Sequence, residues 1–335
     1  MYNMVTKLRL EIYRITLQKK VKGKNGETWE NCNYSEFLNQ FDRDKTKALP
    51  SLWTKFVDYF QNEFLINKNG DRAITATEEC RHTFDSNKNI INGEVDGGPT
   101  NREQRIFKQK DSKRTKGKVD DDDVVTSRFF IKFWLPVDYS TGALMIQSYT
   151  TSNISELVRI HFTKFVQSRG FRILPTSYYP KSFMEERNKH SNVISVSYVQ
   201  DKLSKGSRKL INPLFADFED LKVKIVVTGF RKSVNEFWHG FTKSGKTLNT
   251  DIDALDLKAD GDNKIVAVYE DEEGRTTTMN IDQNRLRNFA YYILPVEIML
   301  AGKNTYDFNK ISQHTNSILL TMQEEIGYRI KKKDA

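Results

Sequence analysis

The chain of 335 residues has a hydrophobic content of 38%, an aromatic content of 12% and a formal net charge of +9 at pH 7. This share of apolar and aromatic side chains excludes an intrinsically disordered chain, and the 17 glycines and 7 prolines exclude collagen-like and low-complexity classes. The surplus of cations favours a polyanionic partner, because net charge sets the long-range attraction between macromolecules.

Cysteine usage and hydropathy bear on the cellular compartment. Cys32 and Cys80 stand far apart and form no Cys-x-x-Cys pair, so neither a disulfide framework nor a zinc ribbon is expected. Residues 1–17 alternate charged and apolar types, unlike a signal peptide, and no later apolar run reaches the length of a membrane span. We therefore expect a reducing, cytoplasmic location and no membrane partner.

Strands and short helices are predicted for the first hundred residues. The alternation in residues 8–17 predicts a strand, and Asn25-Gly26 predicts a hairpin turn after it. Ser35 can cap a short helix that reaches Phe41, and apolar residues at helical spacing over residues 52–60 predict a second helix. Residues 64–77 predict two strands about Asn69-Gly70. We interpret the glycine-rich residues 87–100 as turns, because they lack the spacing of a phosphate-binding loop.

A block of charge lies in residues 101–123, which we expect to be an insertion between two strands. Six cations within residues 107–118 precede four consecutive aspartates: Lys108, Lys110, Lys113, Arg114, Lys116 and Lys118, then Asp120, Asp121, Asp122 and Asp123. The block is compatible with a solvated loop or with an arm that contacts phosphates. The aspartates predict no metal site, because consecutive residues of an extended chain point to opposite faces. No cofactor is expected.

The clearest secondary-structure signals occupy residues 129–169. Residues 129–135 and 143–150 predict a buried antiparallel pair of strands. Asn153 and Glu156 form a capping box, and an apolar stripe follows them as far as Gly170. This pattern predicts an amphipathic helix over residues 153–169, packed on the sheet. His161 lies on its apolar face, where we expect a core histidine.

The stretch RFFIKFWLPVDYSTGALMIQSYTTSNISELVRIHFTKFV, residues 128–166, resembles a segment of uncharacterised bacterial proteins associated with anti-phage defence. In those proteins too, two apolar strands with an element similar to LIQS lead into a helix. The resemblance includes no catalytic motif and assigns no residue as active or binding. It implies a setting in defence or mobile-element biology.

Residues 193–199 and 221–230 predict two more strands, the second of them central in its sheet. A cationic turn between them is a second candidate for phosphate contact, through Lys202, Lys205, Arg208 and Lys209. An enzymatic alternative starts from an acid-x-Lys pattern, which suits a nuclease whose carboxylates hold Mg²⁺ while the lysine orients water. Its candidate residues are Asp217, Glu219, Asp220, Lys222 and Lys224.

The C-terminal third is predicted to be a polar hairpin followed by helices. Residues 250–280 predict solvent-facing edge strands, and residues 284–294 carry apolar side chains at helical spacing before Pro295. Asp307 can cap a last helix, whose apolar stripe runs to residue 326. This stripe fits either a core helix or a self-association seam, so residues 305–331 are a candidate surface for a partner protein or a second copy.

Together these patterns predict an α+β protein, with an antiparallel sheet, a packed amphipathic helix and a helical C-terminal part. We expect a sheet domain over residues 1–230 that carries the basic insertion, and a possible assembly region over residues 231–335. The favoured function is a non-catalytic nucleic-acid-binding component of a bacterial anti-phage defence system. The alternatives are the Mg²⁺-dependent nuclease and an interaction subunit that acts through its last helix.

Overall fold

The computed structural model describes residues 7–23, 26–61, 63–100, 104–108, 111–119, 124–150, 152–181, 191–200, 203–234, 236–237, 264–271, 276–282, 285–287, 291–301, 303 and 305–328. The chain forms two compact units, Met1–Tyr178 with Ala290–Ala335, and Tyr179–Phe289. Each unit has an antiparallel sheet of its own, so the α+β class holds at the level of a large antiparallel sheet with a few helices. The second unit is inserted into the first, whereas the predicted division at residue 230 falls inside a strand of that insertion.

The first unit contains one large sheet, a small ribbon and helices. Its elements are β1 (Leu8–Gly23), β2 (Gly26–Asn31), α1 (Tyr34–Leu38), α2 (Lys45–Val57), β3 (Leu65–Ile66), β4 (Arg72–Thr75), β5 (His82–Asp85), β6 (Ile90–Pro99), β7 (Gln104–Lys108), β8 (Asp111–Val119), β9 (Ser127–Trp134), β10 (Thr141–Tyr149), α3 (Ser155–Gln167), β11 (Phe171–Ser177), β17 (Tyr292–Ile293), η3 (Val296–Ile298) and α7 (Phe308–Glu325). The large sheet has the order β11-β1-β10-β9-β6-β4-β3, while β2 and β17 also pair with β1 and β5 pairs with β6.

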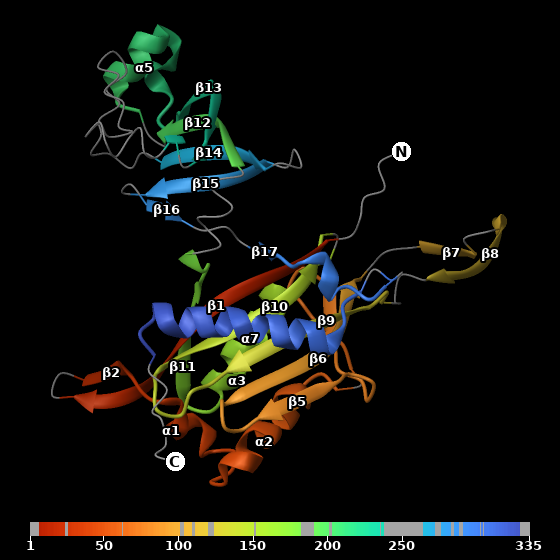
Figure 1. Ribbon diagram of the computed structural model, residues 1–335. Helices are drawn as coiled ribbons and strands as arrows, with labels where there is room; N and C mark the ends of the chain where they lie inside the picture. Colours follow the sequence, from red (N-terminus) through yellow and green to blue (C-terminus); the bar gives the residue numbers. More distant parts are fainter. Residues whose placement is uncertain are drawn as a thin grey trace. The chain divides into compact units, whose positions relative to one another are not determined.

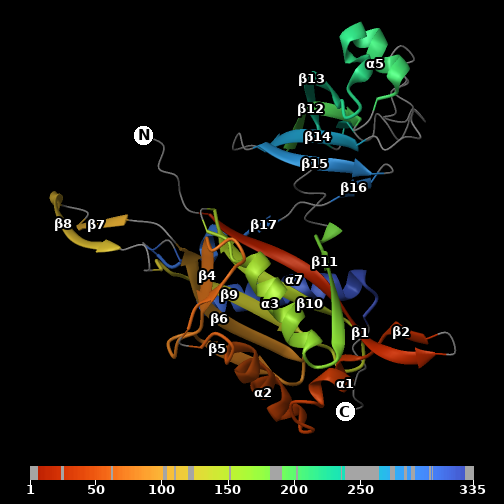
Figure 2. The same ribbon diagram turned by 180° about the vertical axis from the view of Figure 1, so that it is seen from behind.

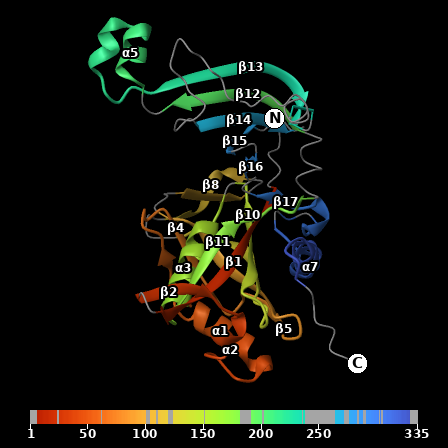
Figure 3. The same ribbon diagram turned by 90° about the vertical axis from the view of Figure 1, so that its left-hand side faces the viewer.

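Strand β9 shows how the two faces of this sheet are covered. Phe133 contacts Phe56 of α2 and Phe162 of α3, with ring centroids 5.5 and 4.6 Å apart. Phe130, which has the opposite parity in the strand, contacts Phe308 of α7 at 5.8 Å. Successive side chains of a strand point to opposite faces, so α2 and α3 cover one face and α7 covers the other. Figure 1 shows α7 in front of the large sheet, and Figure 2, the view from behind, shows α3 in front of it. In Figure 3, α3 and α7 lie on opposite sides of the sheet.

Several predicted elements are confirmed. The strand at residues 8–17, its antiparallel pairing with β2 from Gly26 onward, the strands about Gly70 and the pair β9–β10 are all present, while Asn25 of the predicted turn lies outside the described residues. The amphipathic helix is α3; in place of a full capping box, Asn153 Oδ1 accepts the Ser155 amide at 2.6 Å. His161 is buried, and its Nε2 lies 3.2 Å from the Phe56 carbonyl oxygen, as expected of a core histidine. The first short helix begins two residues earlier than predicted, because Asn33 and not Ser35 occupies the N-cap position, and it ends at Leu38.

Residues 87–89 form the expected turn, but the interpretation of the rest of residues 87–100 as turns is wrong, because they contain β6, which lies between β9 and β4. Its glycines serve close packing within a strand. A Cβ on Gly93 would lie 2.2 Å from the Trp53 ring of α2, and a Cβ on Gly98 would lie 2.0 Å from the Val125 carbonyl oxygen. Glycine is therefore required here to let a helix and a loop approach the sheet.

The last helix begins as predicted, because the Asp307 carboxylate accepts the amides of Asn309 and Lys310 at 2.9 and 3.1 Å. Its buried side chains are Phe308, Ile311, Thr315, Ile318, Leu319, Met322 and Gln323. This stripe packs on the large sheet of its own unit, so α7 is a core helix. None of the helices among the described residues is long and apolar enough to cross a membrane.

The predicted helix at residues 284–294 is wrong in its described part. Residues 285–287 form a strand, and Tyr292 and Ile293 pair with Leu10 and Arg9 of β1. The apolar spacing fits a helical period, but the run is too short for periodicity to separate a helix from a strand. The pairing with β1 also returns the chain to the first unit after the insertion.

The second unit is a smaller sheet in the order β13-β12-β14-β15-β16, with one described α-helix and a 3-10 helix. Its elements are β12 (Ser191–Gln200), α5 (Lys205–Ile211), η1 (Pro213–Asp217), β13 (Val223–Ser233), β14 (Lys264–Asp271), β15 (Thr276–Asp282) and β16 (Arg285–Arg287). Its described core contains Val193, Val196, Val234, Phe237, Ala267 and Tyr269. Strand β13 is an edge strand with Val226 and Val227 exposed, so its predicted central position is wrong. The predicted polar hairpin is β14–β15, but its predicted edge position is wrong, because β14 pairs with β12, β15 pairs with β16, and β16 forms the edge.

Candidate functional site

The basic block at residues 101–123 contains a two-stranded antiparallel ribbon where we expected a loop. Strands β7 and β8 carry six basic residues and one acidic residue between them. Strand pairing depends on backbone hydrogen bonds, which a high content of charged side chains does not prevent. Arg105 is paired with Lys118, and Lys108 with Asp111. Lys110 and the four aspartates at 120–123 lie outside the described residues.

The second predicted basic surface is a helix where we expected a turn. Lys205 and Lys209 are exposed on α5, whereas Arg208 is buried and donates to the Phe218 carbonyl oxygen. Arg208 therefore stabilises the connection between α5 and the segment after η1, and its guanidinium is not presented to a ligand. Lys202 lies outside the described residues.

The residues of the nuclease alternative lie on the surface of the second unit. Asp217 ends η1, Glu219 and Asp220 follow it, and Lys224 belongs to edge strand β13; all four are exposed, as is Lys222. Within the described part of the chain, no group of three or more His, Cys, Asp or Glu side chains is arranged to hold a metal ion. The geometry therefore provides no specific support for a Mg²⁺ centre at these residues.

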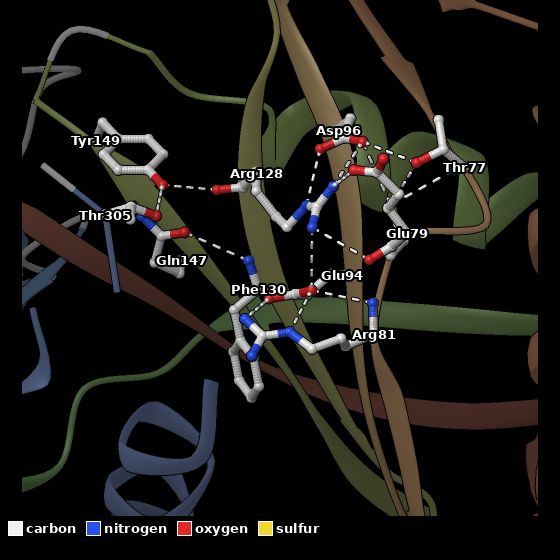
Figure 4. A network of polar contacts seen from close by, with 11 residues as sticks. Thr77, Glu79, Arg81, Glu94, Asp96, Arg128, Phe130, Gln147, Tyr149 and Thr305 are labelled. Atoms are coloured by element: carbon white, nitrogen blue, oxygen red, sulfur yellow. Dashed lines mark hydrogen bonds and ion pairs between the residues drawn. The ribbon is translucent and has the colours of Figure 1, made fainter. Parts of the chain in front are cut away.

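A network of charged side chains around one fully buried carboxylate, which the sequence did not indicate, lies on the α7 side of the large sheet (Figure 4). Glu94 of β6 is fully buried and accepts two hydrogen bonds from the Arg81 side chain, at 2.9 and 3.1 Å, and one from its amide at 3.0 Å. Arg128 of β9 donates to Asp96 at 3.1 and 3.4 Å and approaches Glu94 at 4.0 Å. The hydrogen bonds from Arg128 to Asp96 raise the pKa of the Arg128 guanidinium above its ordinary value.

This network has a structural role. It joins β6 and β9 to the segment before β5, and Arg81 also stacks 4.8 Å from the Phe308 ring at the start of α7. Buried charges that satisfy one another fix the register of the elements that carry them, while removal of one partner is costly. The strict alternation of polar and non-polar residues in Ile91-Asn92-Gly93-Glu94-Val95-Asp96-Gly97 is the sequence signal that could have revealed both the strand and its polar face.

Lys132 of β9 is a buried cation on the same face. Its side chain is fully buried, and its ammonium donates to the Ser312 carbonyl oxygen at 3.1 Å and to the Asn316 side chain, both on α7. Burial lowers the pKa of the Lys132 amine to about 7; the nearby Lys88 adds to the decrease and Asp85 opposes it. Lys132 therefore links the stability of the α7–sheet contact to proton binding.

The opposite face of the large sheet carries a cleft of about 630 Å³, close to the start of α3. At its floor, the buried Glu11 carboxylate accepts hydrogen bonds from Tyr13 at 2.6 Å, Asn153 at 2.6 Å and Ser155 at 2.8 Å. Burial and the Glu11 charge raise the pKa of Tyr13, so its hydroxyl remains a donor. The cleft is also lined by Lys68, Arg72 and Arg159, together with Asp71, Glu156 and Ile160. These residues are far apart in the sequence and were not predicted as a site.

Comparison with known proteins identifies no family. No protein-family model matches the chain, and no curated protein matches it.

Proposed function

We propose that this protein is a non-catalytic DNA-binding protein that contacts the phosphates of a duplex through the β7–β8 ribbon. The observation that carries the proposal is the concentration of six basic residues on the two short strands of this separate ribbon. Arg105 lies directly opposite Lys118 in the ribbon, and a polyanion would relieve the repulsion between these two like charges; the other charged pair, Lys108 and Asp111, is of opposite sign.

The two-stranded form of the ribbon favours duplex DNA over duplex RNA. The major groove of B-form DNA admits a two-stranded β-ribbon, whereas the major groove of an A-form RNA helix is too narrow for protein side chains to enter. Lys205 and Lys209 of α5 add a second exposed pair of cations in the other unit. The resemblance of residues 128–166 to defence-associated proteins supplies the proposed setting, which is bacterial anti-phage defence.

The test compares three proteins in a fluorescence-anisotropy titration with a labelled 30-base-pair DNA and the corresponding RNA duplex. The ribbon variant replaces Lys113, Arg114, Lys116 and Lys118 with Gln. The matched control replaces three exposed lysines and one exposed arginine elsewhere with Gln, namely Lys22, Arg43, Lys47 and Lys164. We expect the ribbon variant to lose at least about tenfold in DNA affinity and the control to lose much less, because phosphate contacts dominate such binding. Equal losses in the two variants would refute the role of the ribbon.

The non-catalytic part of the proposal is tested separately. Plasmid DNA, single-stranded DNA and RNA are incubated with the protein and either Mg²⁺ or Mn²⁺, and we expect all three to remain intact. Cleavage that disappears in an Asp220→Ala protein would replace the proposal with the nuclease alternative.

A further inference from the structure

The cleft beside α3 contains cations and carboxylates that do not pair with one another. Among the described residues, no carboxylate lies within ion-pair distance of Lys68, Arg72 or Arg159. Arg72 instead donates to the Asn153 carbonyl oxygen, and the Arg159 guanidinium lies 5.1 Å from the centre of the Tyr13 ring. The three cations of this cleft therefore have hydrogen-bond donors that are not paired with a described carboxylate.

The carboxylates of the same cleft are either committed to other partners or placed at its rim. Glu11 accepts three hydrogen bonds from neutral groups, and Asp71 accepts one from the Asn67 side chain at 2.6 Å. Glu156 is exposed in the first turn of α3. Because no local acid forms a direct ion pair with Lys68, Arg72 or Arg159, an anion that enters the cleft gains charge-assisted hydrogen bonds without displacing an existing ion pair.

The remaining surface of the cleft defines the rest of the ligand. Ile160 is 40% exposed and offers an apolar contact beside Arg159. A carboxylate has about four acceptor positions, and Glu11 uses three of them, so one stays open to a hydroxyl or amino donor of a ligand. The volume of about 630 Å³ lies in the range of sites for small organic ligands and exceeds the needs of a simple ion.

We propose that this cleft binds a phosphate monoester of nucleotide size, with its phosphate held by Arg72, Arg159 and Lys68 and its organic part against Ile160 and Glu11. The site is formed by β1, the β3–β4 turn and α3, and it contains no residue of the β7–β8 ribbon. Its occupancy is therefore independent of the proposed DNA contact.

The test is isothermal titration of the full chain with the 5′-monophosphates of adenosine, guanosine, cytidine and uridine, with the four unphosphorylated nucleosides and with inorganic phosphate. We expect at least one nucleotide to bind with a Kd below about 1 mM, and its nucleoside to bind at least about tenfold more weakly, because the phosphate provides the charge-assisted contacts. Inorganic phosphate should also bind more weakly than the nucleotide, because it cannot use Ile160 and Glu11.

Variants assign the binding to the cleft. Arg159→Gln and the exposed Lys68→Gln should each weaken nucleotide binding, by about tenfold for Arg159→Gln, while Arg43→Gln outside the cleft should leave it unchanged. Thermal unfolding of each variant shows whether it is folded. If loss of the Arg159–Tyr13 contact unfolds the Arg159→Gln protein, Lys68→Gln provides the test instead. The ribbon variant should bind the nucleotide normally. Absence of binding by all four nucleotides, or binding unaffected by both cleft variants, would overturn the proposal and leave the DNA-binding proposal intact.

Discussion

Lys132 makes the stability of the first unit depend on pH in a direction that can be calculated. Its pKa is lowered to about 7 in the folded protein, from 10.5 for a solvated lysine. Between these two values the unfolded chain binds more protons than the folded chain, so the free energy of unfolding rises with pH from about 7 upward. Below pH 7 both states bind the proton and the dependence disappears.

The size of the effect follows from the two pKa values. A single group with these values lowers the free energy of unfolding by about 4 kcal/mol at pH 7 and by about 2 kcal/mol at pH 9. Wild-type protein should therefore gain about 2 kcal/mol from this group between pH 7 and pH 9. The window ends at pH 9 because burial raises the pKa values of Cys32 and of several tyrosines, whose ionisation destabilises the fold at higher pH.

The assay compares wild type with Lys132→Met, in which the titrating amine is absent. Urea unfolding at pH 7, 8 and 9 is followed by tryptophan fluorescence, since Trp29, Trp53 and Trp134 all belong to the first unit. The free energy of unfolding of Lys132→Met should lack the increase of about 2 kcal/mol between pH 7 and pH 9, whatever its absolute value. The control Lys47→Met, at an exposed lysine of α2, should keep this increase. If wild type and Lys132→Met show parallel pH profiles, Lys132 does not titrate in this window and the reasoning is refuted.

Two other substitutions test the large sheet. Glu94→Gln should lower the free energy of unfolding by about 2 kcal/mol, because Arg81 loses a charged acceptor while Arg128 keeps Asp96. Glu30→Gln at an exposed position should change it little, and equal effects in chemical denaturation would argue against the network. Gly93→Ala should lower the free energy of unfolding by about 2 kcal/mol, because the added methyl group overlaps the Trp53 ring. Most of this loss should disappear in a Trp53→Leu background, whereas additive losses would contradict the contact.

Local sequence patterns predicted the elements whose signals are contained within one segment. The apolar stripe of α3 and the Asp307 cap of α7 need only neighbouring residues to be recognised, and both are present. Strand β6 was missed because its glycines and Asp96 suggested turns, while the reason for Gly93 is a tryptophan 40 residues away in the chain. Local spacing predicts a helix at residues 292–293, because their actual partner, β1, lies at the other end of the chain.

The candidate sites were likewise predictable only where their residues are neighbours in the sequence. The basic block was visible as composition, but its pairing into a ribbon was not. The cleft joins Glu11, Arg72 and Arg159, which come from three separate elements. No spacing rule connects such residues, because the large sheet and α3 bring them together only after folding. The buried Lys132 was hidden for a related reason, since one cation in an apolar strand does not reveal which helix covers it.

The most direct test of the central claim, that the ribbon cations neutralise DNA phosphates, is the slope of log affinity against log salt concentration between about 50 and 200 mM. Each phosphate contact contributes about −0.9 to this slope on duplex DNA, so replacing Lys113, Arg114, Lys116 and Lys118 with Gln should make it shallower by about 3.6. The Lys22, Arg43, Lys47 and Lys164 control should keep the wild-type slope. A ribbon variant with an unchanged slope would contradict the account, even if its affinity were reduced.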